Sequence, residues 1–488
     1  MDEREGIEVI MKNSIRFVLD GKVVEIDFGP ASKLTPTTTV LNYLRSLPQH
    51  RGVKEGCAEG DCGACTIVLG ELNAQEKIEY RAVDSCIVFL PMLHGKQLIT
   101  VENLKTQAGE MHPVQQAMVD FHGSQCGFCT PGIVMTLFAL YKSGTKPSKE
   151  GVAEALAGNL CRCTGYEPIL KAALKVCDGK GEDHFAAELS HTAELLGLIS
   201  SESFSIQTEG QRYDQPSTLD ECLALIGSHP DAMIINGATD VALRVTKKFE
   251  VLPHIVDCSR IAELRSVSSD NRAVTIGAGV RVTEVMNTIK DDFPALHQML
   301  SVFAAHQIRN LATLGGNIGT ASPIGDTLPV LMAYGASIVL TSREGSRTVS
   351  ADSFVKGYRK TERRADELIT AVILPQPTKG MHVRAYKVSK RRDLDIATVS
   401  AGFRLNLDGD GTVKEITLAY GGMAECTKRS VKTEEFLKGK KWHRRHVEEA
   451  QRVVDSEFSP ISDVRGSAEF RRVAARNLLL KFWSETNG

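Results

Sequence analysis

The sequence predicts a multidomain α+β protein in which two cysteine-rich domains precede a longer mixed region. Apolar residues alternate near the N-terminus around a first group of cysteines, and a helical period then surrounds a second group. The remaining chain mixes strands and helices. No G-x-G-x-x-G motif follows a strand there, so a Rossmann fold is not supported. The 488 residues are enough for roughly three or four domains of ~100–200 residues each.

Residues 14–95 are expected to form a small ferredoxin-like β-grasp domain. Apolar residues alternate over 15–19 and 24–28, and Asp20-Gly21 between them predicts a β-hairpin with a type I′ turn. Thr39 precedes a helical run, and the first cysteine loop follows that helix. Two further strands are predicted at 66–69 and 78–83.

The loop from Lys54 to Cys65 spaces its cysteines C-x4-C-x2-C, the pattern of plant-type [2Fe–2S] ferredoxins. Gly56, Gly60 and Gly63 allow the sharp turns that such a loop needs, and their N–H groups can point at cluster sulfurs. The alternative is a structural zinc ion with four cysteine ligands, although zinc sites usually show two C-x2-C pairs. The expected ligands are Cys57, Cys62, Cys65 and Cys86.

Residues 96–178 are expected to form a four-helix bundle. A first helix covers 112–122. Thr130-Pro131 then predicts a second helix with threonine at the N-cap and proline at the first helical position. Pro147-Ser148 and Pro168 open the third and fourth helices.

Two loops of this bundle carry a second set of four thiolates, one as C-x2-C and the other as C-x-C. This spacing differs from the usual zinc patterns, so a second iron–sulfur cluster is the stronger interpretation and zinc is the alternative. Two clusters in series would make an electron path. The expected ligands are Cys126, Cys129, Cys161 and Cys163.

Residues 179–210 have no clear period and are rich in charged residues, serine and glycine, which predicts a linker with a possible short helix over 186–198. A mixed α+β domain is expected over 211–378. It begins with a capped helix over 217–226 and a buried strand at Met233–Ile235.

Two glycine-rich stretches in this domain are candidates for phosphate binding. The turn at 236–240 follows the strand and precedes a helix, a geometry that lets backbone N–H groups approach a phosphate. The stretch at 313–326 adds paired glycines, hydroxyls and a carboxylate, which suit a pyrophosphate and a ribose. The alternative for each stretch is an ordinary tight turn.

The last α+β domain is expected over 379–488. Its strands are predicted at 383–388, 399–407 and 413–420, and its helices at 445–458 and 467–483. A charged loop at 391–393 is ordinarily only a solvated surface.

The composition excludes several classes of protein. A net charge of −2 gives no reason to expect nucleic acid or an anionic membrane as a partner. The acidic N-terminus has no apolar core of a signal peptide, and no apolar run approaches the ~18 residues of a membrane-spanning helix. Twelve cysteines without a secretion signal predict metal binding in a reducing, cytoplasmic compartment. Four cysteines outside the two sets are expected to be buried small apolar residues: Cys177, Cys222, Cys258 and Cys426.

The long motifs around the cysteines resemble the iron–sulfur half of the molybdenum hydroxylases, the family of xanthine dehydrogenase, aldehyde oxidase and carbon monoxide dehydrogenase. The resemblance rests on the ferredoxin loop with Cys86, on Gln125–Gly132 and on Asn159–Tyr166. The two glycine-rich stretches resemble the family's FAD-binding domain, which is α+β and not a Rossmann fold. The resemblance thus implies two [2Fe–2S] clusters and FAD.

Carried over position by position, the resemblance also implies the flavin-binding residues. The pyrophosphate loop would be Ile234, Ile235, Asn236, Gly237, Ala238, Thr239, Asp240 and Val241. The flavin-contacting positions would be Phe303, Thr313, Ile369 and Lys387, and Asp326 would fall at a ribose or adenine-side position. The second glycine stretch would add Gly315, Gly316, Asn317, Thr320 and Ser322. Tyr358 falls where the family places an aromatic residue near the nicotinamide, and the loop at 391–393 would lie beside the flavin and gate access of NAD.

Within the family, the resemblance points to the small subunit of the bacterial xanthine dehydrogenases. Such a subunit passes electrons from a molybdenum centre on a large partner chain through two clusters to FAD and on to NAD, during oxidation of hypoxanthine and xanthine to urate. No residue for the hydroxylation itself is expected here, and the partner would bind the molybdopterin, as a heterotetramer of two small and two large chains.

Three alternatives stay open at this point. The chain could serve another molybdenum hydroxylase, acting on an aldehyde or an N-heterocycle. It could be a free-standing NADH-dependent flavin and iron–sulfur reductase, or a scaffold held together by zinc.

Overall fold

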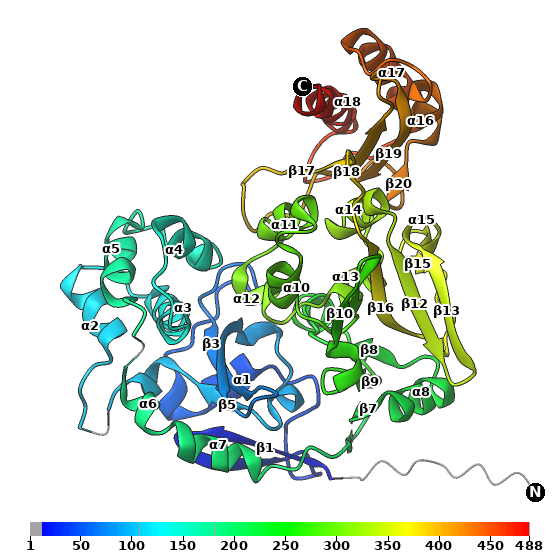
Figure 1. The fold of residues 1–488 in the computed structure, drawn as a ribbon. Helices are drawn as coiled ribbons and strands as arrows, with labels where there is room; N and C mark the ends of the chain where they lie inside the picture. Colours follow the sequence, from blue (N-terminus) through cyan, green and yellow to red (C-terminus); the bar gives the residue numbers. More distant parts are fainter. Residues whose placement is uncertain (1–11, 107, 181, 488) are drawn as a thin grey trace, which may run out of the picture. The chain divides into compact units, whose positions relative to one another are not determined.

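The computed structural model describes residues 12–106, 108–180 and 182–487. The chain divides into two compact units (Figure 1). Unit 1 holds the chain up to Ser217 together with 231–260 and 305–312. Unit 2 holds 218–230, 261–304 and the chain from Thr313 onward. The multidomain α+β class predicted from the sequence is confirmed.

A five-stranded sheet of order β2-β1-β5-β3-β4 opens unit 1. The turn between β1 and β2 has positive φ at Asp20 (52°) and Gly21 (66°), as a type I′ turn requires, so the predicted hairpin is confirmed. Helix α1 begins after its cap Thr39, as predicted. The elements are β1 (Ser14–Leu19), β2 (Lys22–Asp27), α1 (Val40–Ser46), β3 (Thr66–Leu72), β4 (Ile78–Asp84) and β5 (Gln97–Ile99).

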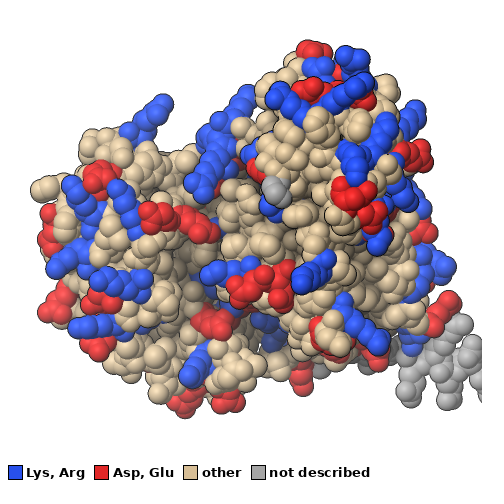
Figure 2. Space-filling view, turned by 45° about the horizontal axis from the view of Figure 1, so that its top comes forward, with Lys and Arg blue, Asp and Glu red and all other residues tan. Residues whose placement is uncertain are grey.

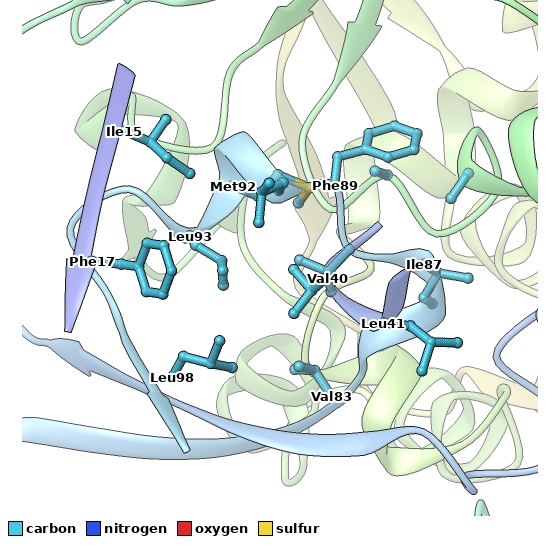
Figure 3. Packing of buried hydrophobic residues seen from close by; sticks show 14 of the residues in the cluster. Ile15, Phe17, Val40, Leu41, Val83, Ile87, Phe89, Met92, Leu93 and Leu98 are labelled. Carbon is cyan, nitrogen blue, oxygen red and sulfur yellow. The ribbon is translucent and has the colours of Figure 1, made fainter. Parts of the chain in front are cut away.

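The buried side chains of this sheet and of α1 point toward one another (Figure 3). Phe17 from β1, Val40 from α1 and Val83 from β4 are each 1% exposed or less. Their burial is the main favourable term that holds the cysteine loop, which connects α1 to β3, in place.

The four helices of the second domain are α2 (Pro113–Asp120), α3 (Thr130–Lys142), α4 (Lys149–Leu156) and α5 (Glu167–Val176). The predicted start of α3 is wrong by one residue. Cys129 is the N-cap, and its carbonyl accepts from the N–H of Ile133 at 3.1 Å, while Thr130 is already helical. The hydroxyl of Thr130 instead lies 2.7 Å from that of Ser124 in the loop before the helix, so a local side-chain contact has replaced the expected cap.

The region expected to be a linker has regular structure over much of its length. It contains α6 (His184–Ala187), α7 (Leu189–Gly197) and β6 (Phe204–Thr208). Helix α7 falls within the possible helix at 186–198, whereas β6 was not predicted, although Phe204 and Ile206 alternate with polar residues. Burial of these two side chains with Tyr213 in the ferredoxin-like core explains the strand.

A four-stranded sheet of order β6-β7-β9-β8 continues from β6. Its other elements are β7 (Gln211–Gln215), β8 (Met233–Ile235) and β9 (His254–Asp257), and α9 (Ala242–Thr246) follows β8. The expected strand at 233–235 is confirmed. Ile235 and Ile255 belong to the same buried cluster as Phe17, so this sheet and the ferredoxin-like sheet share one core within unit 1.

His94 makes part of unit 1 sensitive to acid. Its Nδ1 accepts from the N–H of Arg16 at 3.0 Å, and its Nε2 lies 3.1 Å from the carbonyl oxygen of Ser200, so the neutral ring satisfies both contacts. Burial, and then the charge of Arg260, lowers the pKa of His94 to about 4.

Between these two pKa values the unfolded chain binds a proton at His94 and the folded chain does not. The contribution of His94 to the free energy of unfolding is therefore lost as pH falls from about 6.5 to about 4. We expect the wild type to lose about 2 kcal/mol more than His94→Gln between pH 7 and pH 5. Urea unfolding followed by circular dichroism at both pH values measures the difference. Parallel losses in the two proteins would contradict this role of His94.

Unit 2 begins with α8 (Leu219–Ser228), whose N-cap is Thr218, so the capped helix expected over 217–226 starts two residues later. Thr218 and Glu221 form a reciprocal capping box, which fixes this start. An antiparallel five-stranded sheet of order β10-β11-β16-β12-β13 follows. Its strands are β10 (Val267–Ser269), β11 (Ala273–Gly277), β12 (Ser337–Ser342), β13 (Gly345–Ser350) and β16 (Leu368–Pro375).

Several helices and a small hairpin accompany this sheet. They are α10 (Val282–Ile289), α11 (Pro294–Ser301), α13 (Leu314–Thr320), α14 (Thr327–Tyr334), α15 (Ala351–Phe354), β14 (Val355–Gly357) and β15 (Lys360–Thr361). Helix α12 (His306–Arg309), from the same stretch of sequence, belongs to unit 1.

The C-terminal part of unit 2 is a four-stranded sheet of order β17-β18-β19-β20 with helices. The predicted strands and helices are confirmed, with ends that differ by three residues at most. They are β17 (His382–Val388), β18 (Val399–Leu407), β19 (Val413–Gly421), α17 (Arg444–Glu457) and α18 (Ala468–Thr486), with β20 (Lys428–Arg429) and α16 (Val431–Leu437) in addition. A Cβ at Gly402 of β18 would lie 2.2 Å from the carbonyl oxygen of Pro329, so α14 packs directly on this sheet.

Basic and acidic side chains are interspersed on the face shown in Figure 2, in keeping with the net charge of −2. Among the residues that the structure describes, none of the helices has the length and apolar character needed to cross a membrane.

Candidate metal centres and cofactor site

The first cysteine loop holds its sulfurs in two pairs. The sulfur atoms of Cys65 and Cys86 lie 3.3 Å apart, and those of Cys57 and Cys62 are hydrogen-bonded to each other. The N–H of Asp61 points at the sulfur of Cys57 at 3.2 Å, so the loop directs an amide toward the site from a residue other than the three glycines expected to do so. Cys62, and then the loop amides, lower the pKa of the Cys57 thiol to about 5, which favours a thiolate.

The second set is paired in the same way across two loops of the bundle. Cys126 is hydrogen-bonded to Cys163, and Cys129 to Cys161. The sulfur of Cys161 also lies 3.2 Å from the hydroxyl of Thr164. Cys126 and Cys163 are exposed, whereas burial and the neighbouring Cys161 raise the pKa of Cys129 to about 12.

Two pairs of thiols suit a binuclear cluster, in which each of two irons takes two thiolates. A zinc ion instead requires four ligands around one point. Within residues 12–106, 108–180 and 182–487, no three or more His, Cys, Asp or Glu side chains converge closely enough to hold a single metal ion. The donor sets therefore fit [2Fe–2S] clusters better than zinc.

The first glycine-rich turn lies between β8 and α9 in unit 1. A Cβ at Gly237 would be 1.8 Å from the carbonyl oxygen of Leu311, so only glycine fits against that backbone. Ala238 has φ of 58°, in the left-handed region. The turn at 236–240 is thus a tight backbone loop, as expected, with residues 311–312 packed behind it.

The second glycine-rich stretch is largely a helix and not an open loop. Thr313 caps α13, and its hydroxyl accepts from the N–H of Gly316 at 3.1 Å. Asn317 accepts from the hydroxyl of Thr327 at 2.6 Å, and the hydroxyl of Thr320 donates to the carbonyl of Gly316. Several predicted ligand groups therefore serve the helix itself. Gly315 remains a close-approach position, since a Cβ there would lie 2.5 Å from that of Ala278.

Two of the expected flavin residues meet in unit 2. The ammonium of Lys387 lies 2.7 Å from Asp326 Oδ2 and donates to the carbonyl of Val302 at 2.8 Å, next to Phe303. Both charged side chains are less than one-tenth exposed. Asp326 Oδ1 is buried and has no hydrogen-bond partner among the described residues. Burial raises the pKa of Asp326 even though Lys387 opposes the shift.

Within the described part of the chain, no hydrogen bond joins Ile369, Ser322 or Tyr358 to this pair. Ile369 is buried on β16, and a Cβ at Gly319 would lie 3.3 Å from its side chain. Ser322 accepts from the N–H of Ile324 in the loop before Asp326. Tyr358 is 63% exposed in the hairpin between β14 and β15.

Family models match most of the chain. Residues 100–174 match a "[2Fe-2S] binding domain", residues 204–377 an "FAD binding domain in molybdopterin dehydrogenase", and residues 384–486 a "CO dehydrogenase flavoprotein C-terminal domain". The chain belongs to the iron–sulfur and flavin part of the molybdenum hydroxylase family.

Proteins similar to this chain over nearly its whole length include xanthine dehydrogenases. It is 34% identical to "Xanthine dehydrogenase/oxidase" of Gallus gallus over 96% of this chain and 39% of that protein. It is 33% identical to "Xanthine dehydrogenase" of Emericella nidulans over 97% of this chain and 38% of that protein. The chain thus spans about two fifths of the length of these relatives.

Solved structures of molybdenum hydroxylases share the fold of about half of the chain. Carbon monoxide dehydrogenase from Hydrogenophaga pseudoflava gives a TM-score of 0.54 at 26% identity, over 56% of this chain and 97% of that one. Quinoline 2-oxidoreductase from Pseudomonas putida 86 gives 0.52 at 26% identity, over 56% and 95%.

Arg471 supports the backbone near the buried Asp326–Lys387 pair in unit 2, and the sequence did not reveal it. Its guanidinium is 2% exposed, binds Asp463 at 2.7 Å, and donates to the carbonyls of Thr398 and Gly422. The N–H of Thr398 donates to Val388, next to Lys387, at 2.7 Å. The sequence pattern of a long helix does not indicate that one of its arginines is buried, because the partners of this arginine come from distant loops.

The N–H of Gly422 extends this support toward Asp326. It donates to the carbonyl of Pro323 at 2.7 Å, three residues before Asp326. Arg471 therefore braces both partners of the buried pair through the backbone.

Proposed function

We propose that this chain is the electron-transfer part of a xanthine dehydrogenase, carrying electrons from a molybdenum centre on a partner chain to FAD and then to NAD. The observation that supports it most is the contact between the two cysteine loops. The N–H of Leu160, beside Cys161, donates to the carbonyl of Cys62 at 3.0 Å. Two clusters bound by cysteines in contacting loops would lie close enough to pass single electrons from one to the other. An electron-transfer chain needs such a relay.

In this proposal the eight paired cysteines bind two [2Fe–2S] clusters. The buried Asp326–Lys387 pair of unit 2 binds FAD, with the free Asp326 Oδ1 accepting from a ligand hydroxyl. When bound, FAD exchanges single electrons with the clusters and a hydride with the nicotinamide. The chain's own residues position these groups and keep water from the buried carboxylate. Tyr358 and the loop at 391–393 would lie on the path of NAD.

The hydroxylation itself is assigned to a molybdopterin-binding partner, in a heterotetramer of two small and two large chains. The relatives named xanthine dehydrogenase extend well beyond the part matched by this chain, which leaves room for such a domain. All twelve cysteines are free, which supports a reducing, cytoplasmic location.

The first test uses the isolated full chain loaded with clusters and FAD. NADH should reduce the flavin, and an artificial acceptor dye should then be reduced catalytically. Purines should not be oxidised until a molybdopterin-containing partner is added, after which xanthine should drive reduction of NAD. Purine oxidation by the isolated chain would overturn the division of labour, and a partner that oxidises only aldehydes or N-heterocycles would overturn xanthine as the substrate.

A further inference from the structure

Gln307 links the segment at 305–312 to the helical cysteine domain within unit 1. Its side chain is fully buried. The amide nitrogen donates to the hydroxyl of Thr136 on α3 at 3.0 Å and to Asn159 Oδ1 at 2.8 Å. The hydroxyl of Thr136 in turn donates to the same oxygen of Asn159 at 2.7 Å. One side chain from the flavin-domain sequence thus closes a buried network inside the bundle.

Asn159 carries this network to the other cysteine loop. Its amide nitrogen donates to the carbonyl of Gly63 at 3.0 Å and to the hydroxyl of Thr66 at 3.2 Å. Asn159 lies two residues before Cys161, and Gly63 follows Cys62 directly. A shift of Asn159 would therefore move the two cysteine loops relative to each other.

The backbone is packed closely at this junction. A Cβ at Gly63 would lie 2.3 Å from the carbonyl oxygen of Gly158, and a Cβ at Gly132 would lie 2.0 Å from that of Gly63. A Cβ at Gly158 would lie 2.1 Å from Oε1 of Gln307. Glycines from three segments let the two cysteine loops approach this closely. The side chains that hydrogen-bond to both loops then determine the distance between the loops.

Neighbouring side chains anchor α12 to both domains. Asn310 donates to the carbonyl of Ala82 in β4 at 2.9 Å, and Arg309 pairs with Glu154 of α4 at 3.0 Å. Oε1 of Gln307 itself is buried and has no hydrogen-bond partner among the described residues. Burying an incompletely paired amide costs free energy. A purely structural role is therefore a poor explanation for a glutamine at this place.

We propose that Gln307 is a positioning residue for electron transfer between the two clusters. It holds Asn159, and through Asn159 it fixes the ferredoxin-like loop against the loop of Cys161 and Cys163. The inference rests on the proposed relay and adds that a residue from the flavin-domain sequence sets the spacing of the two clusters.

The test is Gln307→Met in the full chain, with clusters and FAD loaded. Methionine has a similar volume but cannot donate to Thr136 or Asn159. In the fully reduced wild type, two paramagnetic clusters in contacting loops should broaden or split each other's EPR signals. We expect this interaction to weaken in the variant and electron exchange between the clusters to slow in freeze-quench experiments, while iron and FAD contents stay at wild-type values.

Gln211→Met is the matched control. Gln211 is also buried in unit 1, donates to the carbonyl of Leu252 at 3.0 Å and accepts from Thr37 at 3.1 Å, and neither of these partners belongs to a cysteine loop. Its replacement removes similar hydrogen bonds and should leave the magnetic interaction unchanged. An equal loss in both variants would overturn the role of Gln307, because general loosening would then explain the effect.

Thr136→Val provides a second variant in case Gln307→Met does not fold. Valine matches the shape of threonine but removes the hydroxyl between Gln307 and Asn159, and it should weaken the interaction in the same direction. An unchanged interaction in a folded variant with both clusters would overturn the inference. If the wild-type protein did not bind two clusters, the proposed relay itself would be wrong.

Discussion

Cys126→Ser is expected to remove one [2Fe–2S] EPR signal and to leave the other in place. Cys126 pairs with Cys163 in the bundle, whereas the ferredoxin-like loop has its own two pairs. Serine is a much weaker ligand than a thiolate for iron. The variant should lose all purine-dependent reduction of NAD in the presence of the partner, yet keep NADH-dependent reduction of dye through FAD.

The control for this variant is Cys177→Ala in the same bundle. Cys177, unlike Cys126, is buried. Its sulfur lies 3.9 Å from the carbonyl oxygen of Leu137, and it belongs to neither cysteine set. Both EPR signals and both activities should survive this change. If Cys126→Ser retained purine-dependent NAD reduction while one cluster was missing, electrons would not pass through that cluster and the relay would be wrong.

Asp326→Ala is expected to weaken FAD binding by roughly 10- to 150-fold. A charge-assisted hydrogen bond between the carboxylate and a ligand hydroxyl contributes about 1.5–3 kcal/mol. The structure adds a second effect, because the change also leaves the buried ammonium of Lys387 without its partner at 2.7 Å. Breaking a buried pair in this way costs about 3–5 kcal/mol of folding stability. Flavin absorbance after gel filtration at falling protein concentration measures retention.

Glu434→Ala separates these two effects. Glu434 is a buried partner of Arg429 elsewhere in unit 2, with side-chain exposure of 7%. Its loss should lower the melting temperature without changing the affinity of the folded protein for FAD. Equal flavin retention in Asp326→Ala and the wild type would remove Asp326 from the flavin site.

The sequence alone was sufficient wherever neighbouring residues decide the structure. Asp20-Gly21 predicted the type I′ hairpin because only residues that accept positive φ form that turn. The cysteine spacings predicted two separate thiolate sets, because a loop can wrap a cluster only with ligands at fixed intervals. The absence of a Rossmann motif and the order of strands and helices likewise follow from local pattern.

Two local expectations differ from the structure where neighbouring contacts favour another conformation. Thr130 was expected to cap α3, but its hydroxyl pairs with Ser124 and the helix begins at Thr130 itself. The alternative for the glycine stretch at 313–326 was a tight turn, but residues 314–320 are helical, with a cap at Thr313 and close packing of Gly315 against Ala278.

Only the tertiary structure decided which distant residues meet. Cys65 pairs with Cys86, Lys387 with Asp326, and Gln307 with Asn159, over separations of 21, 61 and 148 residues. Hydrogen bonds and ion pairs form over a few ångströms, whereas sequence patterns report on neighbours along one helix or strand. The kinds of side chain needed for electron transfer could therefore be predicted from the sequence. Their buried partners were set by packing among elements that are far apart in the chain.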